Sequence, residues 1–355
     1  MATCVFEDPL ALAVLRWDEI EELSFLNIEY PVPRRFRSGR GYLDVLNIDS
    51  EAFRHQFRFE QMDLMELCSA LRVPHTIRTA QNVAIPGQEA LCILLRRLSY
   101  PNRLCDLEGM FGRHSSTLSS ATTVVLNHLT STFGQLTADL SAHTWLNRAS
   151  LDEFSEAVRA KGAPLQNCWG FVDGTARPIC RPTEDQRLYF SGHKRVHAIK
   201  YQGVMCANGI IVEMNGPYPG HRHDAGILRL SGLYERLEDL VQGSVYTIYG
   251  DPAYPLRPLL QKPFMGASLT AAEQNFNKKM SSVRQAVEWG FGKVSTLFAF
   301  VDFKKNQKHR LQRVSDMYQA ATLLTNCHTC LYGSQTSTYF QLSPPTLDEY
   351  LSPRY

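Results

Sequence analysis

Two aspartates in the second half of the chain follow hydrophobic runs. Asp173 follows Trp-Gly-Phe-Val at residues 169–172, and Asp251 follows Val-Tyr-Thr-Ile-Tyr-Gly at residues 245–250. Each run predicts a buried strand that ends on an acid, and an unpaired carboxylate is costly to hold beside a hydrophobic core. Such an aspartate is either a turn residue, as in many Asp-Gly pairs, or a ligand for a cation at the strand end. The repeated construction favours the cation.

Two further acids have settings that allow them to join this pair. Asp224 precedes the apolar residues 225–228 and marks a predicted helix start, where aspartate is also a good N-cap, so capping remains an alternative. Glu288 lies in residues 280–298, where apolar side chains recur at helical spacing. It is one position from Val287, about 100° around the helix, and therefore lies beside the buried stripe. From there its carboxylate can reach the strand ends.

Four converging carboxylates imply metal ions. At an effective dielectric constant of 20, two carboxylates about 5 Å apart repel by roughly 3 kcal/mol. Bound divalent cations remove this repulsion, and ligands that offer only oxygen suit Mg²⁺ or Mn²⁺ rather than zinc. Two such ions about 4 Å apart can activate a water, hold a phosphate and stabilise a departing oxygen. We therefore interpret Asp173, Asp224, Asp251 and Glu288 as ligands of two divalent cations, Mg²⁺ or Mn²⁺.

The elements that would position these acids form a sheet with helical cover. Strands are predicted in residues 168–175, 197–207, 210–220 and 244–254, and helices in 269–298 and 313–329. Asn208-Gly209 is a hairpin signal between two of the strands. This order predicts an α/β sheet domain, alternatively α+β, over residues 161–333. Residues 334–355 are rich in Ser, Thr and Pro, and we expect a loosely ordered tail.

Residues 1–160 are predicted to be largely helical. The helical patterns cover residues 57–73, 87–100 and 115–133. A short helical pattern, Gly112 and a Ser/Thr-rich helix start give residues 89–133 the rhythm of a helix-turn-helix. Its second helix would present Arg113 and His114 to DNA, whereas the alternative is a plain helical bundle with capped ends. Upstream, the arginine-rich residues 33–41 form either a solvated loop or a phosphate-binding one.

Bulk composition sets the limits on function. The chain has 355 residues, 44% of them hydrophobic and 20% charged, which is ordinary for a globular protein with one large core and a smaller domain. Its formal net charge is +2, so any nucleic acid must be bound by local basic patches. We expect no membrane span and no signal peptide, because the apolar runs are short and the first residues contain scattered acids. The nine cysteines fit reduced intracellular thiols.

The chain resembles the PIF/Harbinger-type transposases and the nucleases derived from them, a family of DDE superfamily endonucleases with an RNase H-like catalytic core. The resemblance covers about residues 55–330 and includes "FVDGTARPI", "GHRHDAGIL", "YGDPAYPL" and "SSVRQAVEWGFGKV". It implies that Asp173, Asp251 and Glu288 form the catalytic DDE triad and that Asp224 is a further metal-site acid. Trp289 stands where relatives commonly carry Arg, and Pro252 where they often carry Ser. Neither departure removes a ligand.

Basic residues near the acids are candidate DNA contacts. Besides Arg113 and His114, they are Lys194, Arg195, Lys293, Lys304, Lys305, Lys308 and Arg310. A charge run is usually a solvated face, yet these residues flank a centre that the resemblance assigns to phosphodiester cleavage, which favours DNA contact. Tyr189, Phe190 and Tyr254 fit either core packing or stacking on an opened base.

The resulting hypothesis is a DNA endonuclease or transposase that uses two Mg²⁺ or Mn²⁺ ions, with strand transfer as a further step. One alternative is a domesticated, non-cleaving derivative that binds DNA or a protein; another is an enzyme that acts on RNA, although nothing visibly reads a 2′-hydroxyl. The resemblance implies a Myb-like accessory DNA-binding protein as a partner, and a homo-oligomer is a further expectation. The expected location is the nucleus, with the cytoplasm as a second location.

Overall fold

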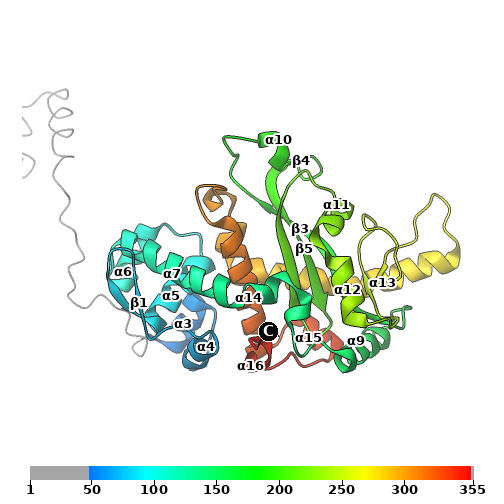
Figure 1. Ribbon diagram of the computed structural model, residues 1–355, viewed down its shortest axis with the longest axis horizontal. Helices are drawn as coiled ribbons and strands as arrows, with labels where there is room; N and C mark the ends of the chain where they lie inside the picture. The colour runs from blue at the N-terminus through cyan, green and yellow to red at the C-terminus, as the bar shows by residue number, and fades with distance from the viewer. Residues whose placement is uncertain (1–47, 353–355) are drawn as a thin grey trace, which may run out of the picture.

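The structure, a computed structural model, describes residues 48–352. A group of helices from the N-terminal part of the chain lies beside a central sheet, and further helices cover that sheet (Figure 1). The arginine-rich residues 33–41, and with them the possible phosphate-binding loop, lie outside the described residues. In the described part of the chain, no helix is both long enough and apolar enough to cross a membrane.

The N-terminal region is helical, as predicted, but it also contains a small hairpin. Its elements are α3 (Ser50–Phe57), α4 (Leu64–Ala70), β1 (Thr76–Arg78), β2 (Ala84–Pro86), α5 (Gly87–Ser99), α6 (Leu104–Phe111) and α7 (Ser115–Phe133). The helices predicted at 87–100 and 115–133 are confirmed. The helix predicted at 57–73 is confirmed only over Leu64–Ala70, because Arg58 adopts a left-handed conformation (φ 71°) that ends α3.

The turn between α6 and α7 has the predicted form. Gly112 is in the left-handed conformation (φ 59°), and its N–H donates to the carbonyl of Glu108. The Glu108 carboxylate also accepts the N–H of Ser115 at 2.7 Å. Hydrogen bonds with the backbone and the side chain of Ser115 lower the pKa of Glu108. A carboxylate therefore satisfies the first turn of α7, where the helix dipole favours negative charge.

The central sheet is mixed. Its strands are β3 (Cys168–Pro178), β4 (Phe190–Ser191), β5 (Val196–Cys206), β6 (Ile211–Pro219), β7 (Thr247–Tyr249) and β8 (Leu260–Gln261). Strands β6, β5 and β3 are antiparallel neighbours, whereas β7 and β8 continue the sheet parallel to β3. The predicted strands and the hairpin at Asn208-Gly209 are confirmed, and the mixed α/β fold is consistent with an RNase H-like core.

Strand β3 does not end at Asp173, and this part of the prediction is wrong. Asp173 pairs with Gly203 of β5, and the antiparallel ladder continues to Pro178. The parallel pairing with β7, in contrast, stops at Phe171. Asp173 therefore lies where β3 loses one of its two neighbours, so its carboxylate is held on a strand beside the point at which β7 ends.

Helices cover the sheet and join it to the N-terminal region. They are α8 (Gln135–Ala138), η3 (Leu140–Ala142), α9 (Arg148–Ala160), α10 (Gln186–Tyr189), α11 (Asp224–Ser231), α12 (Leu233–Val241), α13 (Ala271–Leu297), η4 (Ala299–Asp302), η5 (Lys304–Asn306), α14 (Val314–Tyr332), α15 (Gln335–Phe340) and α16 (Leu347–Tyr350). Helix α9, at the predicted domain boundary, packs on β3, and α14 contacts both β6 and α7. One continuous hydrophobic core therefore runs through both predicted regions.

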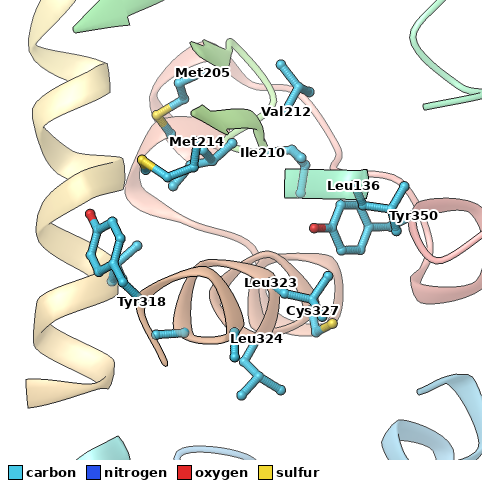
Figure 2. Packing of buried hydrophobic residues seen from close by; sticks show 14 of the residues in the cluster. Leu136, Met205, Ile210, Val212, Met214, Tyr318, Leu323, Leu324, Cys327 and Tyr350 are labelled. Atoms are coloured by element: carbon cyan, nitrogen blue, oxygen red, sulfur yellow. The ribbon is translucent and has the colours of Figure 1, made fainter. Parts of the chain in front are cut away.

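The C-terminal segment is packed, so the prediction of a loosely ordered tail is wrong over residues 334–352. Phe340 stacks on Phe171 of β3, with ring centroids 6.1 Å apart. Tyr350 is fully buried beside α14, and its hydroxyl accepts a hydrogen bond from Asn326 at 2.8 Å (Figure 2). Trp289, the departure from the family pattern on α13, meets Tyr339 edge-on at 5.3 Å. A few large side chains at the right positions anchor an otherwise polar segment.

His143 makes stability dependent on pH. It is 1% exposed, its Nε2 lies 3.1 Å from the carbonyl of Val212, and burial lowers its pKa to about 4. Because the folded pKa lies below the ordinary value, the unfolded chain takes up a proton first as pH falls. We expect the free energy of unfolding to fall between pH 6.5 and pH 4, by about 3 kcal/mol from this group.

Urea unfolding across this pH range measures the effect. His143→Gln removes the titrating group and should flatten the dependence, whereas His55→Gln, at an exposed position, should leave it unchanged. Equal pH dependence in wild type and His143→Gln would contradict the assignment to His143.

Candidate active site

Asp173 and Asp251 are brought together by the register of two parallel strands. Phe171 of β3 pairs with Tyr249 of β7, and each aspartate lies two residues further along its chain. Alternate residues of a strand share a face, and neighbouring strands lie about 4.8 Å apart. The two carboxylates are close enough to interact: burial, and to a smaller extent the charge of Asp251, raise the pKa of Asp173. The predicted convergence of these two acids is thus present.

Asp224 is the third acid of this group. Its carboxylate lies against Gly174, where an added Cβ would be 2.7 Å from Oδ1. Burial, and next the charge of Asp224, raise the pKa of Asp251. The helix-capping alternative is not supported, because His223 occupies the N-cap of α11 and no side chain makes a capping hydrogen bond there.

A buried tyrosine lies beneath the three aspartates. Tyr254 is 1% exposed, and its pKa is raised by burial first and then by the charges of the three acids. Its hydroxyl accepts a hydrogen bond from Gln202 at 3.2 Å, and Gln202 in turn accepts one from Ser231 at 2.9 Å. This chain ties the turn after Asp251 to β5 and to the end of α11. Tyr254 therefore packs in the core rather than stacking on a base.

Two cations partly balance the acids. Lys200 Nζ lies 3.4 Å from Asp224 Oδ1 and donates to the carbonyl of Arg222 at 2.6 Å. Arg284 Nη1 lies 3.2 Å from Asp173 Oδ2, and its Nη2 lies 3.6 Å from Glu288 Oε1. Sequence analysis missed Arg284, although its position four residues before Glu288 is the spacing at which helical side chains of opposite charge meet.

Glu288 lies beside the buried stripe of α13, as predicted, but it does not join the aspartates. Its side chain is 61% exposed and contacts Arg284, which lies between Glu288 and Asp173. Among residues 48–352, no hydrogen bond or ion pair links Glu288 to the three aspartates. The helix itself is fixed against the sheet, because Gly203 leaves room for the Phe291 ring.

The three aspartates have the carboxylate oxygens that a divalent cation prefers, but their side chains do not enclose a binding site for one. Three neighbouring aspartates offer carboxylate oxygens, and the pKa values of Asp173 and Asp251 are raised by burial first and then by the charge of a neighbouring acid. Within the described residues, however, no three acidic, histidine or cysteine side chains are grouped tightly enough to hold a metal ion. Arg284 occupies the place between Asp173 and the fourth predicted ligand.

Two of the predicted DNA contacts are internal. Arg113 is 11% exposed and forms a bidentate pair with Glu89, at 2.6 and 2.8 Å. Lys293 donates to Thr329 Oγ1 at 2.9 Å and to the carbonyl of Gly333 at 2.7 Å, and burial lowers its pKa to about 8. Both residues hold helices together inside the protein, which disfavours DNA contact by either; that contact stays a prediction.

The remaining predicted contacts lie at the surface. Lys194, Arg195, Lys304, Lys305 and Lys308 are exposed, and we call these five residues the basic surface. Its two segments are far apart in the chain but lie near each other in the fold: the pKa of His197, two residues after Arg195, is lowered by burial first and then by the charges of Arg181 and Lys304.

Two further predicted contacts are exposed but already have partners. Arg310 pairs with Glu184 and Asp185 at 2.5 and 2.6 Å. His114 is the N-cap of α7, and its Nδ1 accepts the N–H of Ser116. Their contact with DNA stays a prediction, as does that of the basic surface.

Two comparisons show which known proteins this part of the chain is similar to. Residues 172–326 match the family model described as a DDE superfamily endonuclease, a segment that contains all four acids and Arg284. The chain is 23% identical over 273 residues to "Protein ALP1-like" from Arabidopsis thaliana, a match that covers 72% of this chain and 65% of that relative. The chain thus spans somewhat less than two thirds of that protein. No solved structure matches. Residues 172–326 are thus similar to DDE superfamily endonuclease domains, and the chain is similar to an ALP1-like protein.

The contact between Gly174 and Asp224 can be tested by a double-mutant cycle. In Gly174→Ala the new methyl group would lie 2.7 Å from Asp224 Oδ1, so we expect a loss of about 1–3 kcal/mol in the free energy of unfolding. In an Asp224→Ala background the same substitution should cost less than about 1 kcal/mol, because the carboxylate is gone. Urea unfolding measures all four proteins. Strictly additive losses would mean that the two residues do not touch.

Proposed function

We propose that this protein is a divalent-metal-dependent DNA endonuclease with an RNase H-like core. Its active site, in this proposal, consists of Asp173, Asp251, Asp224 and Glu288, where it hydrolyses the phosphodiester bonds of DNA. The observation that carries the proposal is the matched position of Asp173 and Asp251, each two residues beyond the last pair of the parallel strands β3 and β7, with Asp224 packed against Gly174. Three neighbouring, half-buried acids are expensive to maintain unless they serve chemistry, and the pKa values of Asp173 and Asp251 are raised, by burial first and then by the charge of a neighbouring acid. The family match over the same residues supports this choice.

Each residue has a role in this proposal. Asp173 and Asp251 would hold two Mg²⁺ or Mn²⁺ ions, Asp224 would support one of them, and Glu288 would complete the site once it separates from Arg284. When bound, such ions lower the pKa of an attacking water and stabilise the departing oxygen. Tyr254 and Gln202 exclude water from beneath the acids and fix the turn after Asp251. Lys200 and the freed Arg284 are placed to neutralise a phosphate.

The basic surface supports DNA as the substrate. Its cations come from two segments that lie near each other in the fold, since the charge of Lys304 acts on His197. Neutralisation of backbone phosphates dominates the affinity of proteins for DNA. In a transposase, the 3′-hydroxyl released by cleavage would attack a second DNA at the same acids. A Myb-like accessory protein, a homo-oligomer and a nuclear location belong to the same proposal.

A second candidate function is a non-cleaving protein that keeps the fold in order to bind DNA or a protein. The pairing of Glu288 with Arg284 favours this alternative, because it leaves the fourth acid apart from the other three. Metal titration separates the two functions: an endonuclease should bind Mn²⁺ in a way that Asp173→Asn abolishes, whereas the non-cleaving protein should show no such site.

Cleavage is tested with supercoiled plasmid in Mg²⁺ or Mn²⁺. We expect wild type to nick the DNA and Asp251→Asn to give no nicking above background, because the substitution removes a charged ligand but keeps the shape of the side chain. Asp239→Asn, at an exposed position on α12, is the matched control and should cleave like wild type. Equal nicking by wild type and Asp251→Asn would refute the role of Asp251.

Arg284 should oppose metal binding, since it already neutralises Asp173 and Glu288. We expect Arg284→Gln to bind Mn²⁺ about tenfold more tightly in calorimetry, equal to about 1.4 kcal/mol. Without metal, the same variant should have a lower melting temperature, because the acids lose their counter-ion. Arg229→Gln, an exposed change on α11, serves as the control. Weaker Mn²⁺ binding by Arg284→Gln would show that the arginine instead orients the ligands.

A further inference from the structure

Residues 262–279 project from the fold; we call this segment the helical arm. It consists of the loop before α13 and the first turns of that helix. None of residues 271–279 is buried, whereas Met280 is fully buried and begins the part of α13 that packs on the core. At 1.5 Å per residue, the exposed part of the helix is about 14 Å long. In Figure 1 this yellow half of α13 and its loop extend away from the sheet.

The arm is a stabilised structure rather than a frayed helix end. Short helices without tertiary contacts are marginal in water. Here Thr270 and Glu273 form a capping box, and Phe276 meets Phe264 edge-to-face at 5.1 Å. The side chain of Asn277 accepts the N–H of Phe264 at 2.9 Å and donates to its carbonyl at 3.0 Å. The loop and the helix therefore hold each other in a fixed shape, and Phe276 also packs against the hydrophobic core.

Both ends of the arm start at the active site. At one end, Lys262 Nζ lies 3.5 Å from the carbonyl of Pro252, the residue after Asp251. At the other end, about one helical turn beyond Lys279, Arg284 pairs with Asp173. The base of the arm thus lies next to the aspartates, and its outer part extends away from them.

The charges and exposed side chains of the arm match a polyanion. Lys262, Lys278 and Lys279 are cationic, and Glu273 is the one acid between residues 262 and 279, with its carboxylate engaged in the capping box. Lys278 and Lys279 are exposed. In the loop, Met265 is 64% exposed and Phe264 is 46% exposed, a pairing of cations with apolar side chains that suits phosphates and base or sugar faces together.

We propose that the helical arm is a second DNA contact, separate from the basic surface, which holds the duplex next to the bond to be cleaved. The inference rests on the proposed function and adds a location: Lys278 and Lys279 neutralise phosphates, and the exposed loop side chains contact the DNA beside them. The basic surface includes the turn next to β4, at the top of Figure 1, whereas the arm lies at the right of that view. DNA held at both places passes over the three aspartates.

The test measures binding of a mixed-sequence duplex of about 30 base pairs in EDTA, so that no cleavage occurs. Fluorescence anisotropy at several salt concentrations gives the slope of log affinity against log salt. Each phosphate contact contributes about 0.9 to this slope, so Lys278→Gln/Lys279→Gln should reduce it by about 2 and weaken binding about tenfold at low salt. The control Arg78→Gln/Arg159→Gln removes the same charge from distant exposed positions and should keep the wild-type slope. Met265→Ser should weaken binding without changing the slope.

The outcomes separate this inference from the proposed function. If wild type binds no DNA at low salt, the proposed function itself fails. If wild type binds and the arm variant keeps the wild-type slope, the arm is not a DNA contact, although the endonuclease proposal stands; binding of a protein partner would then be its remaining role. An equal loss of slope in the control variant also overturns the inference, because net charge alone would explain it. Unchanged melting temperatures establish that the variants fold.

Discussion

The parallel pairing of β3 with β7 is the constraint on which the candidate site depends. Because Phe171 faces Tyr249 across this pair, two aspartates that are far apart in the chain come to the same height on the same edge of the sheet. A shift of one residue in register would send one of the carboxylates to the opposite face. The Phe340 ring packs on Phe171 and a Gln202–Tyr254 hydrogen bond holds the turn after Asp251, so the surrounding core resists such a shift.

Electrostatic repulsion among the acids is balanced within the chain itself. Lys200 neutralises part of the charge of Asp224, while Arg284 bridges Asp173 and Glu288. The same arginine that stabilises the acids also keeps Glu288 from them. In the proposed function, an endonuclease and a non-cleaving binding protein would therefore differ in whether Arg284 separates from Asp173 and Glu288. That choice concerns one side chain on the surface of α13 and needs no change in the sheet.

Regions at both ends of the described chain support the site from a distance. The N-terminal helices share one core with the sheet, and α14 contacts both. The C-terminal segment packs Trp289 of α13 against Tyr339, at the position after Glu288. Arg113 and Lys293 are used inside these contacts, the first with Glu89 and the second with Thr329 and Gly333. Basic residues that look available for DNA in the sequence are thus partly used to hold helices together.

The sequence by itself determined the elements whose patterns are local: the strands around Asp173 and Asp251, the hairpin at Asn208-Gly209, and α13 with Glu288 beside its buried stripe. Hydrophobic periodicity and turn residues encode these features within a few neighbouring positions. Only the tertiary structure decided that β3 continues past Asp173, that Arg284 separates Glu288 from the aspartates, and that the polar tail is packed. These features depend on partners that lie far along the chain, and the identity of such a partner follows from the packing of the whole molecule.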